Sequence, residues 1–354
     1  MTQKTSHYYN MDLVRYILAI SVLVNHFNVL SGSDFYWPIP SNIAVGVFFG
    51  LSGFLVYNSY LRRPDLKQYI KNRIKRIVPP YLFIILSCAT GLALLSSLPS
   101  YDYFSSSSFW KYLGANICFL NFLQPTLPCV FDHLPISAVN GSLWTLKVEW
   151  MLYLSVPLFI WLIHKFHFNI SFTIFIIIIL SVIYRLFFEY LFEHTHQDIY
   201  RIMSYQFCGQ MVYFFTGILF HHLLPLLKKH LLSVSLSCIL IYALCFSMNL
   251  LMEYNMITDF ISSLSMPVSL VSLALVVCIM PPLGNWVKYL NNYSYEIYLF
   301  HFPIIQVFIS LREFQNTPPL QLLLLSLFVT IMIAYSENNL YNKLSFLVSS
   351  HFRS

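Results

Sequence analysis

The stretch DLVRYILAISVLVNHF, residues 12–27, is apolar enough to enter a lipid bilayer although it contains Arg15 and His26. Apolar windows of about 20 residues, the length that crosses a hydrocarbon core roughly 30 Å thick, recur from one end of the chain to the other. Of the 354 residues 58% are hydrophobic and 10% are charged, whereas an average soluble domain has about 25% charged residues. The sequence therefore predicts an all-α, polytopic membrane protein.

The apolar windows predict ten membrane-spanning helices. They cover residues 11–30, 43–61, 80–98, 143–164, 170–190, 203–224, 231–252, 259–280, 291–312 and 320–341. Tyr112 to Leu123 is too short to span and is expected to be an interfacial or re-entrant segment, inside the long hydrophilic connection 99–141. No metal-ligand spacing, internal repeat or Gly-rich phosphate loop is found in the sequence, so no metal is expected.

The Lys and Arg residues are distributed unevenly among the connections between the predicted spans. One alternate set is rich in Lys and Arg: Lys4, residues 62–76, Lys165, Lys228, Lys229, Lys288, Lys343 and Arg353. The other set is poor in them: residues 31–42, 99–141, 192–198, 253–259 and 312–319. By the positive-inside rule both termini are cytoplasmic, and the first span is retained because no cleavage pattern follows it. This distribution argues against nucleic acid as the partner that the net charge of +6 suggests.

Seven cysteines are present, most of them in apolar spans where a cysteine acts as a small hydrophobic residue. Cys118 and Cys129 lie in the long outer connection, where an oxidising compartment permits a disulfide. A disulfide and two free thiols both stay open at this stage.

Two costly polar residues share the first predicted helix. Burying an arginine at a helix centre costs about 2.5–3.5 kcal/mol, so such a residue usually marks a functional site. Arg15 and His26 are eleven positions apart, about three turns, which places them on one face roughly 16 Å apart along the axis. Alone, Arg15 could be an anchoring arginine that reaches the interface and His26 a packing residue. The aligned pair favours a polar groove along the helix.

Glu149 lies in NGSLWTLKVEWMLYLSVP, residues 140–157, about one and a half turns into the fourth span from the outside. Its depth therefore matches that of His26. A carboxylate beside an imidazole fixes the tautomer and raises the basicity that general-base catalysis on a hydroxyl requires. The alternative is a structural ion pair with Lys147 or with another helix.

The segment RRPDLKQYIKNRIKRIVPPY, residues 62–81, carries a cluster of seven Lys or Arg, and Pro79 and Pro80 mark its junction with the third span. Four of these cations fall at helical i, i+3 and i, i+4 offsets and could together bind one polyphosphate ligand: Lys71, Arg73, Lys75 and Arg76. The alternative is an anchor that binds anionic lipid head groups.

Three further residues are weaker candidates for a substrate site or cavity: Ser52, Trp144 and His301. Ser52 and Gly53 also indicate close helix packing, since small residues let backbones approach. His301 follows Glu296 in the ninth span; it could line the same cavity as His26 or form a hydrogen bond with a neighbouring helix, and spacing does not decide between these.

In their order along the chain, five segments resemble motifs of the acyltransferase 3 family of integral membrane O-acyltransferases. They are RYILAISVLVNHF, GVFFGLSGFLVY, RIKRIVPPY, GSLWTLKVEWMLYLSVP and YSYEIYLFHFP. The match consists of an Arg and a His separated by ten residues, SGF at Ser52 to Phe54, an RxxR at Arg73 and Arg76, a WSLxxE-like piece that ends at Glu149, and SYxIYLxH. The resemblance covers about residues 10–345.

The resemblance implies transfer of an acetyl group from cytoplasmic acetyl-CoA to a sugar hydroxyl of O-antigen, capsule, exopolysaccharide or a lipid-linked precursor, in a bacterial inner membrane. It implies that the RxxR cluster binds CoA phosphates, that Arg15 steadies the thioester, and that His26 is the general base or carries the acyl group, oriented by Glu149. The expected partners are this glycan and membrane lipids; a homo-oligomer stays open. One transmembrane domain over 1–354 is expected, without a soluble SGNH domain.

Two positions depart from the family pattern. Thr145 replaces the serine of WSL but keeps its hydroxyl, and Glu337 resembles the terminal Glu-x-Pro without the proline. The rival hypothesis is a transporter or flippase of an acyl donor or glycan that uses Arg15, His26 and Glu149 as a relay. A scaffold, whose charges only pack helices, leaves the RxxR and the Arg15 to His26 alignment unexplained.

Overall fold

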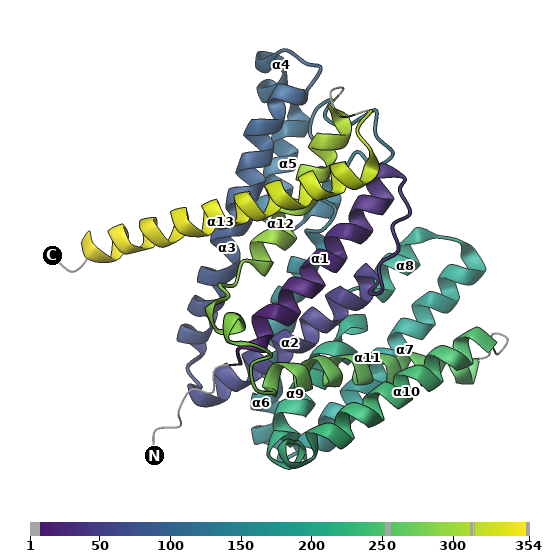
Figure 1. Ribbon diagram of the computed structural model, residues 1–354. Helices are drawn as coiled ribbons and strands as arrows, with labels where there is room; N and C mark the ends of the chain where they lie inside the picture. Colours follow the sequence, from purple (N-terminus) through teal and green to yellow (C-terminus); the bar gives the residue numbers. More distant parts are fainter. Residues whose placement is uncertain (1–7, 252–255, 312–313, 315, 352–354) are drawn as a thin grey trace. The chain divides into compact units, whose positions relative to one another are not determined.

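The computed structural model describes residues 8–251, 256–311, 314 and 316–351, and it leaves out the side chains of residues 250 and 340–351. All secondary structure elements of the described residues are helices (Figure 1). The long helices are α1 Asn10–Ser31, α2 Ser41–Arg62, α3 Leu66–Gly91, α6 Trp144–Phe166, α7 Ile170–Thr195, α9 Phe207–Leu227, α10 Leu231–Leu251, α11 Met256–Ile279, α12 Ser294–Ser310 and α13 Pro319–His351. The short ones are η1 Leu92–Leu95, α4 Ser100–Ser105, α5 Ser107–Ile117, η2 Asn121–Leu123, α8 Asp198–Ser204, η3 Lys228–His230 and η4 Asn285–Tyr289.

Among the described residues, eight segments are long and apolar enough to cross a membrane. The chain is therefore a polytopic membrane protein, as predicted. Two features account for the difference from the expected ten. Residues 198–249 count as one segment although they contain α9 and α10, which only the 3-residue η3 separates. Helix α12, with 17 residues, is shorter than every segment counted.

The chain forms two compact units. Unit 1 consists of residues 1–15, 42–70 and 148–290, and unit 2 consists of residues 16–41, 71–147 and 291–354. The division runs through α1, α3 and α6, so each of these helices contributes to both units.

Close contact between α2 and α9 holds unit 1 together. A Cβ added at Gly53 would lie 2.1 Å from the backbone oxygen of Phe214, and one added at Gly217 would lie 1.9 Å from the backbone oxygen of Gly50. Neither distance is compatible with a side chain, so glycine is required at both positions. The prediction that Gly53 marks close helix packing is confirmed.

The long connection between α3 and α6 belongs to the core of unit 2. Tyr103 and Tyr112, at 0% and 2% exposure, pack with residues of α3 and α12. The hydroxyl of Tyr103 donates to the backbone oxygen of Ala89 at 2.9 Å, which satisfies a polar group that burial would otherwise leave unpaired. Burial raises the pKa of Tyr103 to about 12, which keeps this donor protonated.

Helix α3 differs from its expected form. It continues through Pro79 and Pro80, so the basic segment and the third span are one helix and the prolines mark no break. A helical proline leaves the carbonyl four residues earlier without its N–H partner. Here those carbonyls belong to Lys75 and Arg76, and both residues are exposed.

Other expectations have simpler outcomes. Cys118 and Cys129 are free, exposed thiols, so the structure contains the unpaired alternative. Several positions used to assign the topology lie outside the described residues: Lys4, residues 253–255, Arg312, Arg353 and the side chain of Lys343.

Candidate functional site

Two histidines form the centre of the candidate site, which lies within unit 2. His26 of α1 and His301 of α12 approach with 2.7 Å between Nδ1 of the first and Nε2 of the second. Their rings are nearly parallel, with centroids 5.0 Å apart and an angle of 5° between the planes. His301 is fully buried and His26 is half-buried. His301 therefore forms a hydrogen bond with a neighbouring helix, α1, through His26. A cavity that both histidines line stays a prediction.

Hydrogen bonding fixes which ring nitrogens carry protons. Nδ1 of His301 lies 3.2 Å from the backbone oxygen of Ile297, which can only accept, so this nitrogen is the donor. In a neutral imidazole the other nitrogen is then unprotonated, so Nε2 of His301 accepts from Nδ1–H of His26. The remaining nitrogen of His26, Nε2, therefore carries a free lone pair. This is the protonation state that a general base needs.

Residues 140–145, which include the start of α6, hold α12 in place beside His301. Thr145 Oγ1 lies 2.7 Å from Tyr298 Oη, one turn before the histidine, and Asn140 donates to the backbone oxygen of Leu299 at 2.8 Å. Thr145, which replaces the serine of the family motif, thus keeps a hydroxyl that forms a hydrogen bond with Tyr298. Trp144, the first residue of α6, is half-buried in the same segment.

A second polar cluster lies in unit 1 and joins two of the predicted residues. The Tyr153 hydroxyl makes a short hydrogen bond to Glu149 Oε1, and Ser52 Oγ lies 3.5 Å from the same hydroxyl. Sequence reasoning missed Tyr153, although its position one helical turn after Glu149 was a usable signal. Lys147, the alternative ionic partner, has its Nζ 4.7 Å from the centre of the Phe122 ring in unit 2.

Arg15 is buried in unit 1, where its Nη1 lies 3.7 Å from the carboxylate of Asp12. Sequence reasoning missed this acidic partner, three positions earlier on the same helix face. Along α1, Arg15 is eleven positions, or roughly 16 Å, from His26, so the helix does not bring these two groups into contact. The groove that would link them stays a prediction.

The cationic residues Lys71, Arg73, Lys75 and Arg76 all lie on α3, so their predicted helical offsets are confirmed. Arg73 is half-buried and the other three are exposed. Guanidinium and ammonium groups on one exposed helix suit a ligand with several phosphates, whether a nucleotide or lipid head groups. The residues present therefore fit the phosphate groups of CoA.

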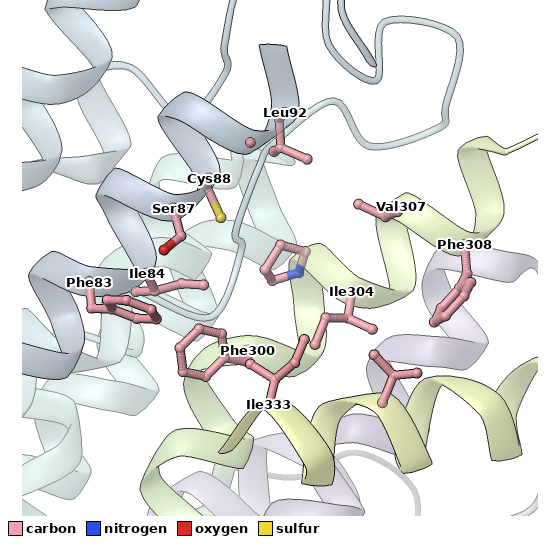
Figure 2. Close-up of a pocket in the computed structure, with 13 residues that line it drawn as sticks. Phe83, Ile84, Ser87, Cys88, Leu92, Phe300, Ile304, Val307, Phe308 and Ile333 are labelled. Carbon is pink, nitrogen blue, oxygen red and sulfur yellow. The ribbon is translucent and has the colours of Figure 1, made fainter. Parts of the chain in front are cut away.

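A separate pocket of about 400 Å³ lies between α3, α12 and α13 of unit 2 (Figure 2). Phe300, Ile304 and Val307 line it from α12. Among its lining side chains only Ser87 and Cys88 carry a polar or polarisable group. Such a lining suits a hydrocarbon chain, and it offers no group that would exchange protons with a hydroxyl near neutral pH.

The fold and the paired imidazoles define a class: an integral membrane protein with a candidate acid–base centre. Comparison with protein families finds a match. The model of the acyltransferase 3 family, described as an acyltransferase domain, matches residues 8–336. The chain belongs to the acyltransferase 3 family, as its motifs predict.

The chain is similar to parts of several known proteins. It is 29% identical over 147 residues to "O-acetyl transferase" of Shigella phage Sf6, which covers 40% of this chain and 43% of that protein. It is 26% identical over 190 residues to "O-acetyltransferase OatA" of Staphylococcus aureus strain NCTC 8325, 49% of this chain and 28% of that protein. It is 28% identical over 195 residues to "Regulator of hypoxia-inducible factor 1" of Caenorhabditis elegans, 47% and 36%. The matched region is thus less than half of each relative, and no solved structure matches.

Proposed function

We propose that this protein is an O-acetyltransferase of the bacterial inner membrane that passes an acetyl group from cytoplasmic acetyl-CoA to a hydroxyl of a cell-surface glycan or its lipid-linked precursor. Family membership supports acyl transfer, and two of the similar proteins are named O-acetyltransferases. The single observation that carries the proposal is the histidine pair, because it gives His26 an unprotonated Nε2.

In the proposed step, Nε2 of His26 takes the proton of the acceptor hydroxyl while the hydroxyl oxygen forms a bond to the thioester carbonyl carbon. The tetrahedral intermediate collapses, the C–S bond breaks, and the thiolate leaves with the proton returned from His26. The products are the acetyl ester and CoA. While His26 is an imidazolium, its Nδ1–H still donates to His301, and this charge-assisted bond is stronger than the neutral one.

The donor side of the proposal assigns the α3 cations to the CoA phosphates. At the cytoplasmic end of the predicted groove, charge-assisted hydrogen bonds would come from Arg73 and Arg76, with Lys71 and Lys75. Arg15 would face the thioester oxygen. This placement rests on a topology of ten spans with both termini in the cytoplasm, which the Lys and Arg distribution supports.

The part proposed for Glu149 changes. The sequence predicted that Glu149 orients His26. Nδ1 of His26, however, is bonded to His301, so the proposal assigns the orienting role to His301. Glu149 is bonded to Tyr153 in unit 1. There the carboxylate would hold the tyrosine hydroxyl and, through it, Ser52 in a fixed position.

Transfer of labelled acetyl by the purified protein tests the function. In detergent, without any sealed compartment, the protein should move radioactive acetyl from acetyl-CoA to a soluble glycan acceptor. His26→Ala should lower the transfer rate by about 10²–10⁴-fold while keeping the thermal unfolding temperature. His164→Ala, which removes an exposed histidine of α6, should leave transfer unchanged. Normal transfer by His26→Ala would overturn the role of this residue. Movement of label only across sealed vesicles, with no covalent product, would favour the transporter.

A further inference from the structure

A second cavity, lined by polar groups, lies within unit 1. Its volume is about 260 Å³, and five helices line it: the first turn of α2, the second half of α7, and parts of α9, α10 and α11. None of the predicted catalytic or donor-binding residues lines it. The predicted catalytic and donor-binding roles therefore do not account for this cavity.

The charged lining is predominantly acidic. Arg185 of α7 is bonded to Glu189 one turn later, with Nη2 and Nε at 3.3 and 3.4 Å from the same carboxylate oxygen. Glu193 and Asp259 add two more carboxylates, so one cation against three anions leaves a formal charge of −2. An anionic ligand would be repelled, particularly where low-dielectric walls strengthen the field.

The neutral lining suits a ligand rich in hydroxyl groups. Ser262 donates to Oδ1 of Asn249 at 2.6 Å, which links α11 to α10 at the cavity wall. Tyr213 adds an aromatic ring. This ring is held tightly against α2, because a Cβ at Gly46 would lie 2.5 Å from it. Carboxylates accept hydrogen bonds from sugar hydroxyls, and amides both donate and accept them.

Size and position narrow the ligand further. The volume of about 260 Å³ equals that of roughly nine liquid waters and falls below the 300–1,000 Å³ or so of pockets for drug-sized ligands. One sugar residue fits this space and a CoA molecule does not. Much of the lining comes from the parts of α2, α7 and α11 nearest to residues 31–42, 192–198 and 253–259, which are poor in Lys and Arg and lie outside in the proposed topology.

We propose that this cavity binds one neutral or amino-bearing sugar residue of the acceptor glycan and discriminates against acidic sugars such as uronic acids. The inference rests on the proposed function for the identity of the glycan. The binding of a sugar by the cavity is open to a test of its own.

The first measurement is kinetic. Asp259→Asn removes a carboxylate of the lining, Ser263→Phe fills the space, and Asp198→Asn removes an exposed carboxylate of α8 that does not line the cavity. The two cavity variants should raise the acceptor KM tenfold or more and leave the KM for acetyl-CoA within twofold, and Asp198→Asn should change neither. An unchanged acceptor KM in both cavity variants, with active wild type, would overturn the inference.

The second measurement uses saturation-transfer NMR to detect equilibrium binding of sugars to the detergent-solubilised protein. The ligands are methyl glycosides of neutral sugars and methyl glucuronide. We expect binding of the neutral glycosides that Ser263→Phe abolishes, and none of the glucuronide. If wild type transfers no acetyl but binds in this way, the proposed function fails and the cavity inference stands. If no glycoside binds, or if Ser263→Phe binds like wild type, the cavity inference fails.

Discussion

The hydrogen bond between His26 and His301 makes a quantitative prediction about catalysis. His301→Phe keeps a ring of similar size in a fully buried position but removes the acceptor for Nδ1–H of His26. A neutral hydrogen bond contributes about 0.5–1.5 kcal/mol, and one to a charged group about 1.5–3 kcal/mol. Because His26 becomes charged only as the hydroxyl is deprotonated, the loss specific to the transition state is about 1–2 kcal/mol.

At 1.36 kcal/mol per factor of ten, this loss lowers kcat by about 5- to 30-fold. The KM for acetyl-CoA should stay the same, because His301 contacts no donor in the proposal. His301→Gln, which keeps an acceptor oxygen, should lose less. His26→Ala removes the general base itself and should cost about 10²–10⁴-fold.

The double variant decides whether His301 works through His26. Residues that act as one unit are not additive, so His26→Ala with His301→Phe should be no slower than His26→Ala alone. The assay is single-turnover transfer of labelled acetyl by protein in nanodiscs, with thermal unfolding as the control for folding. Two independent, multiplying losses would refute the dyad, and so would wild-type kcat in His301→Phe.

Three further predictions concern packing, the donor site and the support of α12. Gly217→Ala, whose Cβ would lie 1.9 Å from a backbone oxygen of α2, should cost at least about 1–3 kcal/mol, whereas Gly114→Ala, with nothing within 4 Å, should not lower the unfolding temperature. The double variant Arg73→Ala and Arg76→Ala should raise the KM for acetyl-CoA. An unchanged KM would indicate that these residues bind lipid head groups instead. Tyr298→Phe should cost about 0.5–1.5 kcal/mol, measured by chemical unfolding, with kcat nearly unchanged.

Sequence alone predicted the long helices well, because each needs only an apolar window of sufficient length and a local boundary. It also placed the α3 cations correctly, since i, i+3 and i, i+4 offsets depend on one helix only. The prolines of α3 were misjudged for a physical reason. Whether a proline interrupts a helix depends on whether the carbonyl four residues earlier has another partner, which local sequence does not state.

The partner of His26 could not be predicted in the same way. His301 is 275 positions away, and helical spacing tells which face a residue occupies but not which helix lies opposite. The cavity of unit 1 escaped for a similar reason. Its charged and polar groups come from five helices, and no single helix shows that they line one cavity.

The cysteines also give the protein a built-in way to report sidedness. Cys118 and Cys129 are exposed, whereas Cys88, Cys245 and Cys278 are buried. A bulky, membrane-impermeant maleimide added to intact spheroplasts would thus alkylate the first two only if the segment after α3 faces away from the cytoplasm. Mass mapping of the adducts would orient the molecule in its bilayer without a single engineered tag.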